Sequence, residues 1–276
     1  MPNLRIVADM ASDRATLVAS STAGSFVVSN LLTDKKSRVW RATGPSATLT
    51  LAWDLPEYLS CVAAPYVDWS SATTWRIRGW SDAAGSIQVL DTGAVLACPA
   101  AAVALRGFTA AQSASAYSFG GGTCARTWFA RVAVRKLTIE INDPANLLGY
   151  LEMAGRLVVG DYWSPAVNAE YGAGVLVVDN STEFENGAGD TSIDAGTFKR
   201  ELSLSMGAMP PADRTAMMGV IRRCRKVYPL FISLFPEASD LEAERDHSIY
   251  GRFKDFSESS LAYYDRYSVP FGIREI

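Results

Sequence analysis

The sequence of 276 residues lacks the side chains that most catalytic and metal sites require. It has a single histidine, His247, so one chain cannot supply two imidazole ligands to a metal, and a Ser-His-Asp triad would need this residue. The four cysteines are far apart and form no C-x-x-C pair, which argues against zinc and redox motifs. We interpret His247 as a structural or exposed side chain, and we expect no metal site, no cofactor and no enzymatic activity.

Many hydrolases use a pair of carboxylates as catalytic groups, and this sequence indicates such a pair only weakly. A retaining glycosidase needs two carboxyl groups about 5 Å apart across a cleft. Asp179, Glu183 and Glu185 could be nominated, but we interpret them as part of a solvated loop whose only ring is Phe184. The same cluster could bind Ca²⁺ through its oxygens, although it lacks the spacing of an EF-hand loop.

Long apolar runs and an excess of basic residues are also missing. No segment reaches the roughly 18 apolar residues of a membrane helix, and the first ten residues lack the apolar centre of a signal peptide. The net charge is -3, so no basic surplus indicates nucleic acid. We expect a protein made in the cytoplasm, with no nucleic acid partner and no membrane insertion.

What the chain does have is enough apolar sequence for one large or two ordinary domains. It is 49% hydrophobic and 20% charged, which is typical of a globular protein. Residues 1–130 hold 10 Lys and Arg against 8 Asp and Glu, whereas residues 131–276 hold 16 against 21. We therefore divide the chain into domains at residues 1–160 and 161–276.

Short strands dominate the first domain. Apolar residues alternate with polar ones over residues 46–53, which is the period of a half-buried strand. The turn Asp54-Leu55-Pro56 should end this strand, and further strands are predicted at 58–65 and 73–80. Residues 99–123 are rich in Ala, Ser and Gly and are predicted to form an irregular loop. Many short strands separated by turns predict an all-β sandwich.

The second domain mixes strands with one helix. Strands are predicted at 175–178, 202–206, 230–235 and 249–253, and residues 180–196 are predicted to form a long polar loop. After Pro210 and Pro211, four apolar residues follow the spacing of a helical stripe: Met217, Val220, Ile221 and Cys224. This pattern predicts a small α+β domain with one helix on a sheet.

Two segments of the first domain carry a resemblance. Residues 30–41, with NLLTD and then VWR, and residues 75–79, WRIRG after a Ser/Thr-rich loop, resemble discoidin-like (galactose-binding-like) domains, whose fold is a jelly-roll β-sandwich. Sandwiches that bind sugars stack them on exposed rings. Trp69 is the best candidate for such a ring, with Asp68 and Tyr66 beside it. The alternative is that the rings are core, as we expect for Trp40, Trp53 and Trp75.

The second domain carries a resemblance of another kind. Residues 160–165 (GDYWSP), the strand at 200–206, the helix at 213–225 and residues 230–236 resemble the ring-forming part of phage distal tail and related tail-tip proteins. The resemblance implies a structural protein of the virion, assembled in the host cytoplasm, whose ring joins the tail tube to the baseplate or receptor-binding apparatus. Its implied partners are the tail tube and hub proteins and a host-surface glycan.

The order of the two parts leaves alternatives open. In the familiar distal tail layout the ring part comes first, so a neighbouring tail-tip protein is the alternative within the phage tail. A carbohydrate-binding protein that recognises host surfaces is the alternative outside it.

A tail tube is cyclic, so we expect a closed ring, most commonly a hexamer. Arg222 and Arg225 on the helix, and Glu183 and Glu185 in the acidic loop, are the candidate contacts between neighbouring subunits. Pairing of these patches within one chain is the other possibility.

Overall fold

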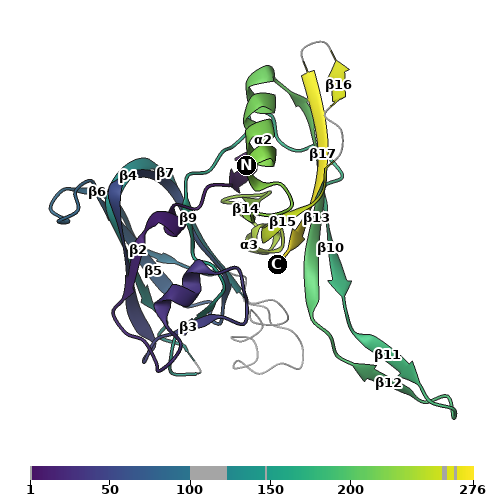
Figure 1. Cartoon of the computed structure of the whole chain (residues 1–276), viewed down its shortest axis with the longest axis horizontal. Coiled ribbons are helices and arrows are strands. Elements are labelled where there is room, and N and C mark those ends of the chain that lie inside the picture. Colours follow the sequence, from purple (N-terminus) through teal and green to yellow (C-terminus); the bar gives the residue numbers. More distant parts are fainter. Residues whose placement is uncertain (1, 100–122, 147, 257–259, 264–265) are drawn as a thin grey trace. The chain divides into compact units, whose positions relative to one another are not determined.

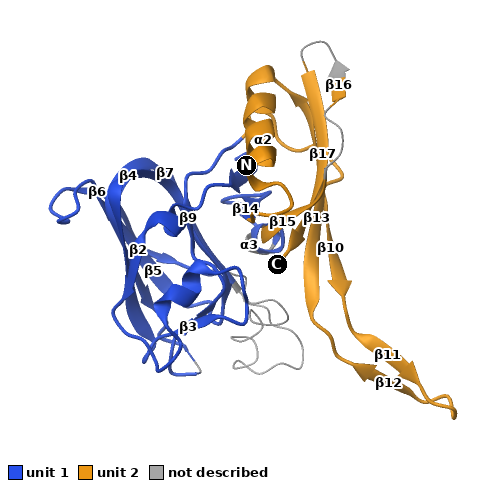
Figure 2. Cartoon of the chain, in the orientation of Figure 1, with its two compact units in different colours: residues 1–164, 230–248 blue, residues 165–229, 249–276 orange. Residues whose placement is uncertain are grey.

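The computed structural model describes residues 2–99, 123–146, 148–256, 260–263 and 266–276 (Figure 1). The predicted loop at 99–123 lies almost wholly outside these residues. The described chain is mainly β, as predicted, and it divides into two compact units (Figure 2). Unit 1 comprises residues 1–164 and 230–248, and unit 2 comprises residues 165–229 and 249–276.

Unit 1 is built on an antiparallel sheet of eight strands. Its order is β3-β8-β4-β7-β5-β6, and both β2 and β9 pair with β4. Outside this sheet, β1 pairs with β14. The elements are β1 (Arg5–Val7), η1 (Ala11–Arg14), β2 (Thr16–Ala19), η2 (Val28–Leu32), β3 (Val39–Arg41), β4 (Ser46–Val67), β5 (Thr74–Trp80), β6 (Gln88–Leu96), β7 (Thr123–Asn142), β8 (Glu152–Ala154), β9 (Val158–Gly160), β14 (Leu230–Ser233) and α3 (Leu241–Asp246).

Strand β4 is longer than the sequence predicts. The expected break at Asp54-Leu55-Pro56 is wrong, because β4 continues through it and pairs with β7 on both sides. The register shifts between Ala52 and Glu57, so the turn residues form an irregularity in the ladder, where a proline needs no backbone donor. The first half of β4 can therefore pair with β2 and the second half with β9.

The core of unit 1 is formed by the apolar residues that alternate with polar ones along its strands, as the sequence predicts. Trp40, Trp53 and Trp75 are all buried, as predicted. Two of their indole groups donate short hydrogen bonds: Trp53 Nε1 donates to Ala11 O at 2.8 Å, and Trp75 Nε1 donates to Thr127 Oγ1 at 2.7 Å. Each large apolar side chain contributes about 1.5–3 kcal/mol by leaving water. All four cysteines are buried free thiols, as expected for Cys61.

The returning segment 230–248 belongs to unit 1 because of buried contacts with β7. Glu244 pairs with Arg126 at 2.9 Å, and both side chains are almost fully buried. Trp128 Nε1 donates to Glu244 Oε1 at 3.0 Å, and the Trp128 ring stacks on Phe231. The sequence predicts the strand at 230–235 but assigns it to the second domain. Its contacts on β7 lie about a hundred residues earlier in the chain, and such distant contacts leave no local pattern in the sequence.

Unit 2 contains a sheet with the strand order β15-β17-β13-β10, and β16 pairs with β17. Helix α2 begins at the predicted prolines and buries Met217 and Cys224, while Val220 and Ile221 are half-buried. The elements are β10 (Gly174–Asp179), β11 (Thr182–Glu185), β12 (Thr191–Asp194), β13 (Phe198–Met209), α2 (Pro211–Cys224), β15 (Ser248–Phe256), β16 (Ser260–Tyr263) and β17 (Arg266–Glu275).

Candidate functional site

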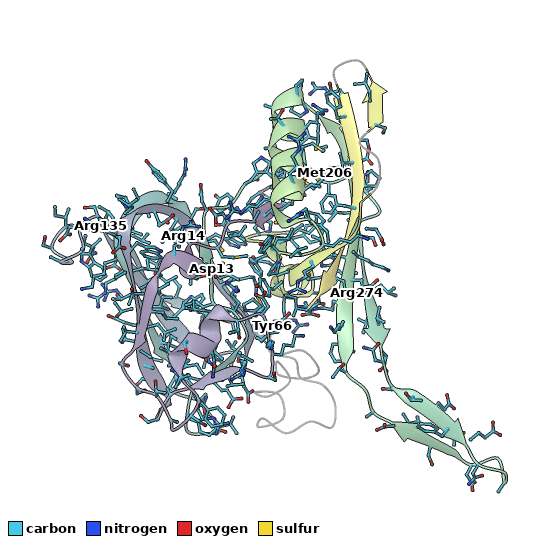
Figure 3. All side chains as sticks on the ribbon, viewed as in Figure 1. Asp13, Arg14, Tyr66, Arg135, Met206 and Arg274 are labelled. Atoms are coloured by element: carbon cyan, nitrogen blue, oxygen red, sulfur yellow. The ribbon has the colours of Figure 1, made fainter. Side chains whose placement is uncertain are left out.

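The residues predicted to bind sugar do not form an exposed platform. Trp69 is 2% exposed and packs edge-on against Trp75, with ring centroids 6.0 Å apart. Tyr66, labelled in Figure 3, is 4% exposed and carries Lys36 Nζ 4.1 Å from its ring centroid. Asp68 is half-buried. The expectation that Trp69 is an exposed loop-tip ring is therefore wrong, because the residues after β4 turn back into the core of unit 1.

A different ring in unit 1 is exposed. Tyr58 on β4 is 55% exposed, and the Arg131 guanidinium lies over its ring at 4.3 Å. Arg131 also forms an ion pair with Asp161 at 2.8 Å, and Asp161 accepts a hydrogen bond from Ser60 Oγ at 2.7 Å. Aromatic faces with charged groups beside them can bind polar ligands. One signal in the sequence could have indicated this exposure, namely the proline two residues before Tyr58.

The most extended feature of unit 2 is a two-stranded projection that we call the β-arm, residues 174–203 (Figure 2). Strand β10 pairs with the first half of β13, and the ladder continues in β11 and β12. At the end, Asn186 N–H donates to Asp190 O at 2.9 Å, and Gly189 takes a φ of +84°, which glycine adopts without strain. The predicted loop at 180–196 is therefore wrong, because backbone pairing orders it without a core.

The β-arm exposes apolar side chains. Every residue from 179 to 197 is exposed. Four of its large apolar residues are 57% to 70% exposed, namely Leu176, Val177, Phe184 and Ile193. Strand β10 is also a sheet edge, and no described strand pairs with its outer side. An isolated hairpin is marginally stable in water, and exposed apolar groups and open edges mark interaction sites.

The end of the β-arm is also strongly acidic. We define the acidic tip as residues 179–197, which include five carboxylates and no Lys or Arg: Asp179, Glu183, Glu185, Asp190 and Asp194. Hydrogen bonds from the Ser181 hydroxyl and amide lower the pKa of Asp179. No group of three potential metal ligands occurs among the described residues.

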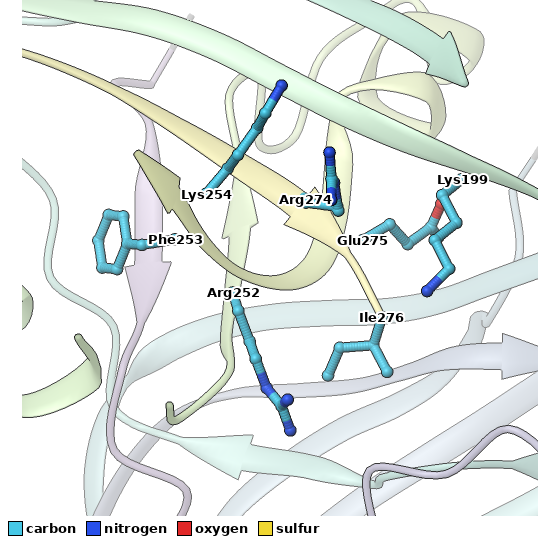
Figure 4. Close-up of a pocket in the computed structure, with 7 residues that line it drawn as sticks. All are labelled: Lys199, Arg252, Phe253, Lys254, Arg274, Glu275 and Ile276. Atoms are coloured by element: carbon cyan, nitrogen blue, oxygen red, sulfur yellow. The ribbon is translucent and has the colours of Figure 1, made fainter. Parts of the chain in front are cut away.

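A basic pocket of about 320 Å³ lies on the sheet of unit 2 (Figure 4). It is lined by Lys199, Arg252, Phe253, Lys254, Arg274, Glu275 and Ile276. At its side, Glu201 accepts hydrogen bonds from Lys254 Nζ at 2.8 Å and from Arg274 Nε. These two hydrogen bonds, led by that of Lys254, lower the pKa of Glu201.

The predicted interface residues lie on separate elements of unit 2. Glu183 and Glu185 are exposed on β11, and Arg222 and Arg225 are exposed near the end of α2. Arg225 ends the helix with a φ of +48°. Within the part of the chain that the structure describes, no ion pair joins the two patches.

His247 has the structural surroundings that we expect. Its ring packs edge-on against Phe235, with centroids 4.9 Å apart, and Nδ1 lies 2.8 Å from Ala243 O.

Among the described residues, no helix is both long and apolar enough to span a bilayer.

The comparisons with known proteins concern the fold of unit 1. No family model and no curated protein matches this chain. Chitosan-binding module 1 of a chitosanase/glucanase from Paenibacillus sp. IK-5 is 10% identical, with a TM-score of 0.37, over 56% of this chain and 96% of that one. The family 32 module of Clostridium perfringens NanJ, solved with galactose, is 13% identical, with a TM-score of 0.37, over 56% of this chain and 97% of that one.

A third structure belongs to the same class. It is module CBM32-5 of Clostridium perfringens CpGH89, solved with GalNAc-β-1,3-galactose, which is 8% identical, with a TM-score of 0.38, over 55% of this chain and 99% of that one. The chain thus has a likeness to family 32 carbohydrate-binding modules over about half its length. At these identities and scores the likeness brings no binding residue to this chain.

Proposed function

We propose that this chain is a structural protein of a long-tailed phage tail tip. Its ring would join the tail tube to the baseplate or receptor-binding apparatus, and its place would be the virion, after assembly in the host cytoplasm. The observation that carries the proposal is the β-arm, which has no buried residue from 179 to 197 and exposes Leu176, Phe184 and Ile193. A projection of this kind gains stability only when another molecule covers it.

The partner that we propose for the β-arm is a second copy of the chain. A contact between two different surfaces of identical subunits is head-to-tail, and it closes into a ring when the rotation between neighbours divides the circle. A hexamer is the size expected for a tail-tube cap. The resemblance of four segments to ring-forming tail proteins supports the same assignment, namely residues 160–165, 200–206, 213–225 and 230–236.

Sedimentation velocity of the purified protein tests this proposal. We expect a ring-sized species that gives closed rings in electron micrographs. Replacing residues 180–196 with Asn-Gly should yield a monomer that stays folded by circular dichroism, because that segment has no buried residue. Immunogold labelling of purified phage should place the chain at the tail tip. A wild-type protein that stays monomeric at high concentration, and is missing from purified tails, would refute the proposal.

A matched pair of variants isolates the apolar contribution of the β-arm. Phe184→Ala with Ile193→Ala should weaken assembly, whereas Leu55→Ala with Ile87→Ala, which removes equally exposed apolar groups from unit 1, should leave it unchanged. Equal effects of the two pairs would mean that general surface hydrophobicity drives association.

Glycan binding by unit 1 is the second candidate function. The exposed Tyr58 ring favours this function, because Arg131 lies over one face of it and is paired with Asp161. The modules similar in fold are named as binding chitosan or were solved with galactose. Calorimetry with oligosaccharides selected on a glycan array should give an affinity that Tyr58→Ala lowers by roughly 1 kcal/mol. An affinity unchanged by Tyr58→Ala would remove this ring from the site.

A further inference from the structure

The turn that joins β11 to β12 contains the dipeptide Asn186-Gly187 (Figure 1). Asn186 is the only asparagine in the sequence that is followed by glycine. Such a pair has a reaction of its own, in which the backbone nitrogen of the glycine attacks the side-chain amide carbon of the asparagine. Glycine favours the attack because it has no β-carbon and adopts backbone conformations that other residues avoid.

The attacking atom of this reaction, Gly187 N, is accessible. Asn186 and Gly187 are both exposed. Within the part of the chain that the structure describes, no group accepts a hydrogen bond from the Gly187 amide. No atom lies within 4 Å of the position that a β-carbon of Gly187 would occupy. The nitrogen can therefore approach a neighbouring carbonyl without first breaking a contact.

The turn also holds the group that is attacked. Asn186 Oδ1 accepts hydrogen bonds from the backbone amides of Ala188 and Asp190, both at 2.9 Å. The bond to Ala188 folds the side chain back over the intervening peptide, which brings Asn186 Cγ towards Gly187 N. The same two amides are placed to stabilise the negative charge that develops on Oδ1 during the attack.

The departing group has a carboxylate beside it. Asn186 Nδ2 donates a hydrogen bond to Asp190 Oδ2 at 3.0 Å. A carboxylate within hydrogen-bond reach can accept the proton that the attacking nitrogen loses and pass it to the nitrogen that leaves. The turn thus supplies an attacking atom, two donors for the developing charge and a group that transfers the proton.

We propose that Asn186 modifies itself in the folded protein and becomes aspartate or isoaspartate. The bond between Gly187 N and Asn186 Cγ forms, the bond between Cγ and Nδ2 breaks, and ammonia leaves with the proton from Gly187 N. Water then opens the five-membered succinimide ring. Its attack at Cγ gives aspartate, and its attack at the main-chain carbonyl carbon gives isoaspartate.

The reaction consumes one water and releases one ammonia for each chain, and it needs no oxidant or cofactor. The inference goes beyond the proposed function and does not depend on it, because every step takes place within one chain.

A second asparagine of the β-arm, Asn180, lacks this arrangement. It is also exposed, but the next residue is Ser181, which has a β-carbon. The Ser181 amide donates to Asp179 Oδ1 at 2.8 Å, so the nitrogen that would attack is already bonded. Asn180 Nδ2 donates across the arm to Thr197 O at 2.8 Å. Asn180 should therefore keep its amide and serve as a control within the same molecule.

The conversion changes both the charge and the backbone of the turn. It adds one carboxylate to the five of the acidic tip. The new carboxylate replaces the donor that now bonds Asp190, so two negative charges face each other there. Isoaspartate also adds a methylene to the main chain, which disturbs the hydrogen bond from Asn186 N to Asp190 O. Older copies of the protein would therefore carry a looser and more acidic tip than new ones.

Timed incubation of the purified chain at neutral pH tests the proposal. Trypsin releases residues 157–199 as one peptide, because no Lys or Arg lies between Arg156 and Lys199. This peptide contains both Asn180 and Asn186, and fragmentation in a mass spectrometer follows each of them. We expect Asn186 to convert to a mixture of aspartate and isoaspartate while Asn180 is unchanged. No conversion at Asn186, or equal conversion at both positions, would overturn the proposal.

Three variants test the groups assigned to the reaction. Gly187→Ala should slow the conversion by about tenfold or more, because the added methyl group restricts the approach of the nitrogen. The alanine fits, since the space around Gly187 is open and its φ is not positive. Asp190→Asn should slow the conversion because it removes the carboxylate. Asn186→Gln should abolish it, since the longer side chain cannot close a five-membered ring. Circular dichroism verifies that each variant is folded.

Unfolding the chain separates the contribution of the turn from that of the dipeptide. In guanidinium chloride at the same pH and temperature, the hydrogen bonds to Oδ1 and Nδ2 are lost while the sequence is kept. We expect the folded chain to convert faster than the unfolded one. A folded chain that converts no faster, or an Asp190→Asn chain that converts at the wild-type rate, would overturn the role assigned to the turn.

Discussion

Trp69 shows how burial decides what a single residue can do. Its ring lies in the core of unit 1 against Trp75, so Trp69→Ala should lower the free energy of unfolding by about 3–5 kcal/mol. Trp69→Phe should cost less, because Trp69 Nε1 has no hydrogen-bond partner among the described residues. Urea unfolding followed by circular dichroism measures both. A Trp69→Ala chain as stable as wild type would contradict the burial.

The negative charge of Asp82 stabilises the loop of residues 82–87. It accepts hydrogen bonds from the amides of Ser86 and Ile87, and these lower its pKa below the ordinary value of 3.8. A lowered carboxyl pKa stabilises the folded loop above pH 3.8, and the benefit is lost as the pH falls through the folded-state pKa. The Ser86 and Ile87 amide signals in NMR spectra should therefore titrate below pH 3.8. Asp82→Asn should abolish this transition, and a midpoint above 3.8 would contradict the prediction.

At the scale of elements, the sequence predicted periodic strands well and strands without apolar contrast poorly. Residues 46–53 alternate cleanly, and the structure confirms their strand and its buried face. Residues 182–185 and 191–194 are exposed, and each strand has only one large apolar residue, Phe184 or Ile193. No hydrophobic period therefore distinguishes them from a loop. The last strand, β17, was missed because its alternating burial involves Val269, Phe271 and Ile273 among glycine and proline.

The candidate sites also differ in how far the sequence alone could predict them. The sequence could nominate Glu183 and Glu185 as acidic contacts from charge alone, and both are exposed. It could not nominate the basic pocket, because Lys199, Arg252 and Arg274 come from three strands distant in the chain. Their proximity depends on the register of β13, β15 and β17, which only tertiary structure reveals.

Helix α3 is held to β7 by one buried ion pair. Glu244→Ala should lower the free energy of unfolding by about 3–5 kcal/mol, since it leaves the Arg126 guanidinium buried without its partner. Adding Arg126→Met should restore much of the loss, because both charges are then gone. Denaturant titrations of the two single variants and the double variant measure the coupling. Strictly additive losses would show that the pair is not coupled.

At the scale of the whole molecule, unit 1 is not one continuous stretch of sequence. A fragment of residues 1–164 lacks Phe231 and Glu244, so its Trp128 and Arg126 lose their partners. We expect this fragment to unfold at lower urea concentration than the same fragment joined to residues 230–248 by a flexible linker. Equal midpoints would mean that the returning segment adds nothing to unit 1.

The pairing of β1 with β14 has a consequence for synthesis. Arg5 lies opposite Ser233 in this ladder, so β1 must wait for a partner strand that is made roughly 230 residues later. At about 5–20 residues per second, the delay is roughly 10 to 45 s. Until β14 is made, Ile6 has its backbone bridge to Trp163, but the edge of β1 that faces β14 stays unpaired. The nascent chain thus carries an unpaired strand edge, which we expect a chaperone to shield until residue 233 has emerged from the ribosome.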